Sequence, residues 1–171
     1  MARKKKGLFF KISSSSMYPA LDIGDIVMAV EKDPGAIKVG IKNGDILILK
    51  GPRYFYENGV DPIIWNDLPP DFPIIHRAIN RKKIGACWYF QTKGDNNWAP
   101  DGSFQLKKKE ARCLSIIYDS KKPIFIPETE ILGVVIKKIP YYGEKRLECK
   151  SEKFLINIQK YKKIEVNVYM D

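Results

Sequence analysis

The sequence predicts a mainly β protein, because three of its features are typical of sheets. Beyond Ser16, short apolar segments alternate with glycine, proline, asparagine and aspartate, the residues that form turns. The segment 163–169 alternates apolar and polar residues with the period of two expected when one face of a strand is buried. Convincing helical periodicity is scarce.

The expected strands follow one another along the chain, each bounded by turn residues. They are 25–30, 45–50, 74–80, 87–93, 114–118 and 131–139. The lysine-rich segment 107–114 fits either a short helix or a solvated loop. Residues 51–72 are rich in aromatics and prolines without a regular period, so we expect an insertion or flap there. Packing of these aromatics in the interior is favoured over a lid or a membrane-touching flap.

Length and composition are those of one folded domain with at most a small appendage. The chain has 171 residues, of which 44% are hydrophobic and 29% charged, so it can bury a core and is not disordered. No apolar run approaches the roughly 18 residues of a membrane-spanning helix. The formal net charge of +10 favours anionic partners without choosing between lipid head groups and nucleic acid. The three cysteines are widely spaced, which predicts free thiols.

The first eleven residues are predicted to form a basic N-terminal tail. A basic run, Arg3–Lys6, precedes the short apolar patch Leu8–Phe10. This patch is too short for the apolar core of a secretory signal, which needs about 7 to 15 residues. The segment fits either a solvated tail or one that rests on a membrane surface.

Four motifs carry residues that could perform chemistry. The serine cluster 13–16 runs directly into Met-x-Pro and an apolar segment, which a flexible linker would not explain. His76 is the only histidine and lies in an expected strand, where a lone histidine is ordinarily structural. Residues 94–102 combine turn formers with two carboxylates, typical of a surface turn or a cation site, although the spacing is not that of an EF-hand. The apolar segment 131–136 by itself indicates only a core strand.

Taken in order, these motifs resemble the type I signal peptidases, membrane-associated serine endopeptidases that remove leader peptides. The resemblance is carried by Ser14-x-Ser16-Met17-x-Pro19, Gly44-Asp45-Ile46-Leu47, His76-Arg77, Gly94-Asp95-Asn96-Asn97 with Asp101, and Gly133-Val134-Val135 leading to Pro140-Tyr141-Tyr142-Gly143. It implies a peptidase domain over residues 12–143 with a signal-peptidase and LexA-like β fold of packed antiparallel sheets and few short helices. Residues 144–171 would form a polar β extension.

The histidine selects a branch within that family. The bacterial branch has a lysine base at this position, whereas the archaeal and endoplasmic-reticulum branch has histidine. His76-Arg77 is similar to the second branch. Lys82 and Lys83 lie nearby in sequence but not at the motif position.

The resemblance implies a role for each candidate catalytic residue. Ser16 would be the nucleophile, with His76 as general base and then as acid to the leaving amine. Asp101 would orient the imidazole and complete a triad, with Asp95 as structural support. Because both carboxylates share one turn, the exchange of their roles stays open.

Oxyanion donors follow from the same resemblance. The backbone N–H of Ser16 and the hydroxyl of Ser14 would stabilise the tetrahedral intermediate. Ser13 and Ser15 have no assigned role.

Substrate contacts are implied in the same way. Met17, Ile74 and Ile75 would line shallow pockets for small side chains upstream of the scissile bond. An extended substrate would pair as an additional strand beside the residues preceding His76.

The resemblance also implies the partners of the chain. They would be a preprotein or peptide substrate, a membrane surface and partner subunits, with an extracytoplasmic catalytic face; nucleic acid, metal and cofactor are not expected. Family members usually carry a transmembrane helix just before the nucleophile, but fifteen residues precede Ser16 here, five of them Lys or Arg. We therefore expect either a soluble or peripheral relative or a shortened chain.

Two other functions compete with leader-peptide cleavage after small residues. A LexA-like self-cleaving regulator would share the serine-based β fold, but such proteins use a lysine base, and His76 argues against this hypothesis. A basic, non-enzymatic β-domain could bind nucleic acid or anionic lipid through its charge and aromatics. Such a domain would need neither the Ser-Met-Pro nor the Gly-Asp-Asn-Asn motif.

Overall fold

A computed structural model describes residues 5–109, 113–118, 123–141 and 164–168 of the chain. The strands in chain order are β1 (Lys5–Lys11), β2 (Ile26–Val30), β3 (Ile46–Leu49), β4 (Ile74–Ile84), β5 (Cys87–Lys93), β6 (Phe104–Lys109), β7 (Cys113–Tyr118), β8 (Ile126–Pro127), β9 (Ile131–Ile139) and β10 (Ile164–Val168). The helical elements are α1 (Arg53–Glu57) and three 3-10 turns: η1 (Pro34–Ala36), η2 (Pro62–Trp65) and η3 (Glu128–Glu130). The predicted mainly β class is confirmed.

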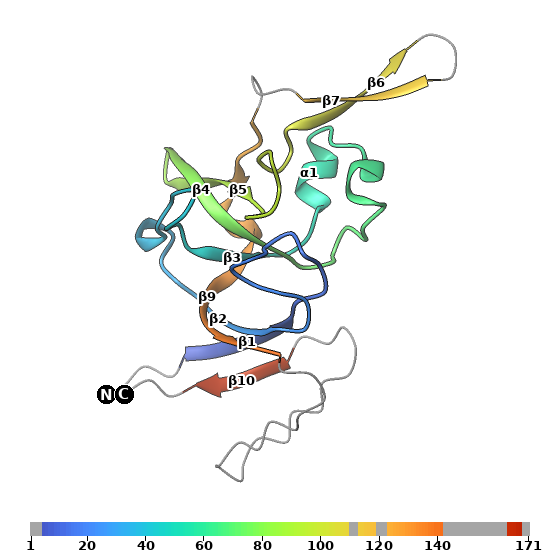
Figure 1. Ribbon diagram of the computed structural model, residues 1–171. Coiled ribbons are helices and arrows are strands. Elements are labelled where there is room, and N and C mark those ends of the chain that lie inside the picture. Colours follow the sequence, from blue (N-terminus) through green and yellow to red (C-terminus); the bar gives the residue numbers. More distant parts are fainter. Residues whose placement is uncertain (1–4, 110–112, 119–122, 142–163, 169–171) are drawn as a thin grey trace.

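Eight of these strands form one antiparallel sheet in the order β10-β1-β2-β9-β3-β4-β5-β8. β6 and β7 pair with each other in a separate hairpin that projects from the body of the molecule (Figure 1). All six expected strands are present within a few residues of their predicted bounds. Of the C-terminal extension predicted over 144–171, residues 164–168 form β10, which pairs with β1, and the others lie outside the described residues.

Two expectations for lysine-rich segments need correction. Lys5–Lys11, expected within a basic tail, is strand β1, which pairs with β2 on one side and β10 on the other. Leu8 is buried and Phe10 packs against a core cluster, so the short apolar patch holds the strand in the sheet. The segment 107–114, expected as helix or loop, contributes to both strands of the β6–β7 hairpin, where backbone pairing outweighs the weak strand propensity of lysine.

In the described part of the chain, two apolar clusters on opposite faces of β3 form the core. Leu47 and Leu49 belong to the first cluster, whereas Ile48 belongs to the second. Because successive strand residues point to opposite faces, burial on both sides explains why this strand is an uninterrupted apolar run. The site described below lies where β3 meets β4.

The aromatic segment 51–72 packs against the first cluster. Phe55 on α1 and Val60 are buried in it, and the ring of Phe55 lies 4.8 Å from that of Trp65, centroid to centroid. These side chains are therefore interior residues of the domain. Within the described ranges, no helix has the length and apolar character needed to cross a membrane.

Candidate active site

The serine cluster is fixed at both ends by buried apolar residues. Ile12 precedes it and Met17 follows it, and both side chains belong to the second core cluster. A turn holds the cluster in place, because the amide of Tyr18 donates to the carbonyl of Ser15 at 3.0 Å. Ser13, Ser14 and Ser15 are exposed and Ser16 is half-buried. The cluster is thus an ordered surface loop, which the linker interpretation did not predict.

Residues of the Gly-Asp-Asn-Asn motif hold this loop from the other side. The amide of Asn96 donates to the carbonyl of Ser16 at 2.8 Å, and its side-chain Nδ2 donates to the carbonyl of Ser15 at 3.2 Å. A Cβ on Gly94 would lie 2.7 Å from the carbonyl oxygen of Ser16. Only glycine allows the two loops to approach so closely.

His76 lies on β4, opposite Leu47 of β3, and faces the serine loop. Its Nε2 is 3.1 Å from the Oγ of Ser16, and its Nδ1 is 2.6 Å from the Oδ2 of Asp101. The two side chains of this pair are buried, with His76 7% and Asp101 5% exposed. The carboxylate only accepts, so Nδ1 carries the proton and Nε2 presents its lone pair to the hydroxyl of Ser16.

Asp101 is held by Thr92, near the end of strand β5. Its amide donates to the carbonyl of Thr92 at 2.8 Å, and the hydroxyl of Thr92 donates to its Oδ2 at 2.7 Å. The chain turns away immediately afterwards at Gly102, whose φ is +78°. Three separate segments therefore bring serine, imidazole and carboxylate into one hydrogen-bonded line.

Asp95 is occupied by a different partner. Nε and Nη2 of Arg77 donate to its two carboxylate oxygens at 2.7 and 2.6 Å. The hydrogen bond to Asp95 raises the pKa of the Arg77 guanidinium, against the opposing effect of burial. Within the described structure, Asp101 contacts His76 and Asp95 braces Arg77, a distinction that depended on distances the sequence could not supply.

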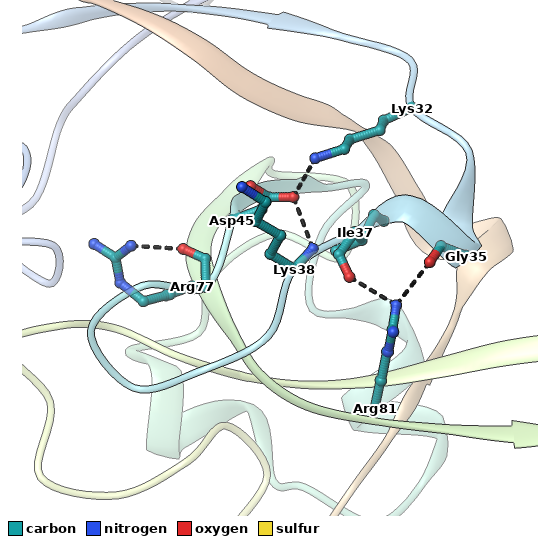
Figure 2. Close-up of polar contacts among 8 residues, drawn as sticks. Lys32, Gly35, Ile37, Lys38, Asp45, Arg77 and Arg81 are labelled. Carbon is teal, nitrogen blue, oxygen red and sulfur yellow. Dashed lines mark hydrogen bonds and ion pairs between the residues drawn. The ribbon is translucent and has the colours of Figure 1, made fainter.

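Arg77 also reaches the loop before β3. Its Nη1 donates to the carbonyl of Gly44 at 2.7 Å, and Figure 2 shows this bond beside those of Arg81 to the carbonyls of Gly35 and Ile37. A Cβ on Gly44 would lie 2.0 Å from the carbonyl oxygen of Ala78, so this position requires glycine. Two arginines of β4 thus fix the loop 32–45.

Asp45, the aspartate of the Gly44-Asp45 motif, has a structural role in the loop before β3. Its Oδ2 accepts from the amide of Lys38 at 2.9 Å and from the ammonium of Lys32 (Figure 2). These bonds close the loop 32–45 on itself just before β3 begins. The motif is therefore structural, and it supports the strand that pairs with the His76 segment.

The expected oxyanion donor and the expected substrate contacts differ in exposure. Ser14 lies beside Ser16, with 3.2 Å between their hydroxyl oxygens. Met17 and Ile74 are buried in the two core clusters, so a substrate could touch only the edges of these side chains. Ile75 is half-buried and packs against the second cluster.

Thr92 is the site residue that sequence reasoning missed. It lies in an expected strand and matches no motif, and a buried threonine in a strand is common. Its contact with Asp101 becomes visible only when the two are seen together in space. The one signal in the sequence was its position two residues before Gly94.

Comparison with known proteins agrees with the motifs. No family model matches the chain. The chain is similar to the signal peptidase complex catalytic subunit SEC11 of Verticillium alfalfae, with 26% identity over 110 residues, which are 64% of this chain and 56% of the relative. The corresponding subunits of Pyricularia oryzae and Sclerotinia sclerotiorum are 27% identical over 110 residues, with the same coverage. The predicted resemblance to type I signal peptidases is confirmed, and the chain spans about half the length of these curated relatives.

Proposed function

We propose that the chain is a serine endopeptidase that removes leader peptides by cleaving after small residues. The observation that carries the proposal is the line from Ser16 Oγ through His76 to Asp101, with contacts of 3.1 and 2.6 Å. These are the distances at which a base can take the proton of a hydroxyl while a carboxylate orients the base. The similarity to signal peptidase catalytic subunits supports the substrate class.

The chemistry follows from the arrangement of the three side chains. Ser16 Oγ attacks the scissile carbonyl carbon while its proton passes to Nε2 of His76, and Asp101 stabilises the imidazolium that forms. Nε2 then gives the proton to the amide nitrogen as the C–N bond breaks, leaving the acyl group on Ser16. Water then attacks this ester while its proton passes to Nε2 of His76; the acyl group leaves as a carboxylic acid, and His76 returns the proton to Ser16 Oγ.

The tetrahedral intermediate needs donors near its oxyanion. The backbone N–H of Ser16 is the first, because Ser16 is the attacking residue and its own amide lies next to the carbon that its Oγ attacks. The hydroxyl of Ser14 is the second. It lies 3.2 Å from Ser16 Oγ and can rotate toward the oxyanion on the carbon that Ser16 Oγ has attacked.

The edge of β4 that β5 leaves unpaired among the described residues supports the binding of an extended peptide. β3 pairs with residues 74–77 of β4, but the register of β5 with β4 begins at Arg77. The backbone of 74–76 therefore has no pairing with β5 on the side opposite β3. A substrate strand added there would lie beside His76, as in β-augmentation.

A membrane-surface contact and partner subunits belong to the same proposal. Tyr18, Ile23 and Tyr141 are between 52% and 57% exposed around the loop that follows Ser16. Lys11 lies over the ring of Tyr141 at 5.7 Å, and Lys138 donates to the carbonyl of Ala20. Tyrosines interspersed with lysines suit the interface of an anionic bilayer. Partner subunits are supported by the relatives' name, which assigns them to a complex.

Vesicle sedimentation tests the membrane contact. Vesicles containing an anionic phospholipid should retain the wild-type protein and release it at high salt, because exposed charges are screened. Tyr18→Ser combined with Ile23→Ser should bind more weakly, whereas Ile41→Ser, which changes an exposed isoleucine elsewhere, should not. Equal retention of all three proteins would rule out this surface.

Cleavage of a leader peptide tests the proposed activity. Wild-type protein should cut the peptide after a small residue, and Ser16→Ala should not. Incubation of the protein alone should leave it intact, which separates leader-peptide cleavage from self-cleavage. A wild-type protein that cuts no leader peptide, or a Ser16→Ala variant that cuts as fast, would refute the proposal.

A further inference from the structure

One oxygen of Asp101 receives two hydrogen bonds inside the protein. Oδ2 lies 2.6 Å from Nδ1 of His76 and 2.7 Å from Oγ1 of Thr92. The threonine hydroxyl must be the donor, because a carboxylate oxygen only accepts. Both contacts have the short lengths typical of charge-assisted bonds.

Thr92 is built to hold its hydroxyl in one direction. It is 1% exposed on β5, and the carbonyl of the same residue accepts from the amide of Asp101 at 2.8 Å. A β-branched side chain has few rotamers in a strand, so the position of its hydroxyl is restricted by the side chain itself. Thr92 therefore forms hydrogen bonds with both the backbone and the side chain of Asp101.

We propose that Thr92 is a positioning residue for the peptidase, acting through Asp101. The inference rests on the proposed function. The Thr92 hydroxyl fixes the rotation of the carboxylate so that Oδ2 meets Nδ1 of His76, and it shares the negative charge on that oxygen. Asp101 then orients the imidazole, while the hydrogen bond from Thr92 weakens the attraction between the carboxylate charge and a protonated imidazole.

The second effect can be measured on the only histidine of the chain. Without the Thr92 donor, the same carboxylate attracts a protonated imidazole more strongly, so His76 holds its proton to higher pH. The other charged groups described around this site are Lys93 on β5, Arg77 on β4 and Asp95 on the following loop. None of them is altered by changes at Thr92, and they act equally in every variant.

Two substitutions at Thr92 separate the hydroxyl from its packing. Thr92→Val keeps the branched shape but removes the donor, whereas Thr92→Ser keeps the donor. We expect Thr92→Val to lower kcat roughly 10- to 100-fold, the range for losing an outer hydrogen-bond partner of a site residue, with KM nearly unchanged. Thr92→Ser should stay within about threefold of wild type. Thr129→Val, at an exposed threonine, is the matched control.

An NMR titration of His76 in a Ser16→Ala background gives a readout independent of cleavage. The titration should move to higher pH with Thr92→Val and stay in place with Thr92→Ser. The inference is overturned if Thr92→Val leaves both kcat and the titration unchanged, or if Thr92→Ser is as defective as Thr92→Val. Should Thr92→Val not fold, Thr92→Ala makes the same predictions. If the wild type itself cuts no leader peptide, the proposed function fails while the titration still tests the contact.

Discussion

The guanidinium of Arg77 and the carboxylate of Asp95 form a two-point ion pair, with Nε 2.7 Å from Oδ1 and Nη2 2.6 Å from Oδ2. Arg77 follows His76 on β4, and Asp95 lies in the loop that holds Ser16 through Asn96. The pair therefore ties the strand of the base to the loop of the nucleophile. It also separates the tasks of the two carboxylates: Asp95 pairs with Arg77, whereas Asp101 is hydrogen-bonded to the imidazole.

The two carboxylates should respond differently to amide substitution. Asp101→Asn should lower kcat by about 10³- to 10⁴-fold with little change in melting temperature, because the imidazole loses its orienting acceptor. Asp95→Asn should destabilise the protein by on the order of 1–3 kcal/mol, because it weakens a half-buried charged pair. Thermal unfolding and cleavage kinetics of both variants provide the check, and the reverse ranking would exchange their roles.

The serines of the loop should differ in importance although they are neighbours. Ser14→Ala should lower kcat by a factor on the order of 10 to 1,000, as expected for the loss of one oxyanion donor. Ser13→Ala and Ser15→Ala are the matched controls and should cleave at close to wild-type rates. If Ser14→Ala matched these controls, its hydroxyl would not be an oxyanion donor.

Asp25 should make the stability of the loop after Ser16 depend on acid. Burial would raise the pKa of Asp25, but hydrogen bonds from the amides of Asp22 and Tyr141, together with Lys138, hold this pKa below its ordinary value. Because the pKa is lower in the folded state than in the unfolded state, the carboxylate stabilises the protein fully above the unfolded-state pKa. This stabilisation is lost as the pH falls through the folded-state pKa. Asp25→Asn should therefore reduce the free energy of unfolding by on the order of 1 kcal/mol at pH 7.

Urea unfolding of wild type and Asp25→Asn at pH 7 and pH 3 measures this difference. It should shrink at pH 3, because the wild-type carboxyl becomes protonated as the pH falls. A difference that is equal at both pH values would show that Asp25 does not stabilise the fold through its charge.

Exchange of the base should not convert the site to the lysine type. In His76→Lys, the ammonium would face the carboxylate of Asp101, which favours the protonated form that cannot accept a proton from Ser16. We expect nearly no cleavage at pH 7 and recovery only at alkaline pH. Cleavage by this variant at the wild-type rate at pH 7 would contradict the assignment of His76 as base.

Sequence patterns predicted most of the sheet because its strands are short, apolar and bounded by turn formers. β3 is an example, since its apolar run reflects burial on both faces at the centre of the sheet. β1 was missed because lysines surround Leu8, and its place depends on pairing with β2 and β10. β8 has only two residues, too few for any pattern.

The motifs named candidate site residues but not the contacts between them. Ser16, His76 and Asp101 were named from the resemblance, but the choice between Asp101 and Asp95 required distances. Thr92 could not be found from the sequence, because its contact joins a strand to a loop nine residues later. Burial of Met17 was likewise a matter of packing, since a methionine after a nucleophile suits a core as well as a pocket.

The proposed proton transfer from Ser16 to His76 can be tested by one comparison, because the chain has a single histidine. The titration of His76 in the free enzyme is followed by NMR and compared with the acidic limb of kcat/KM, using a leader peptide for which chemistry limits the rate. We predict that the two curves coincide, because only the neutral imidazole can accept the proton of Ser16. An acidic limb that departs from the His76 titration, together with unchanged cleavage by His76→Ala, would remove His76 from the mechanism.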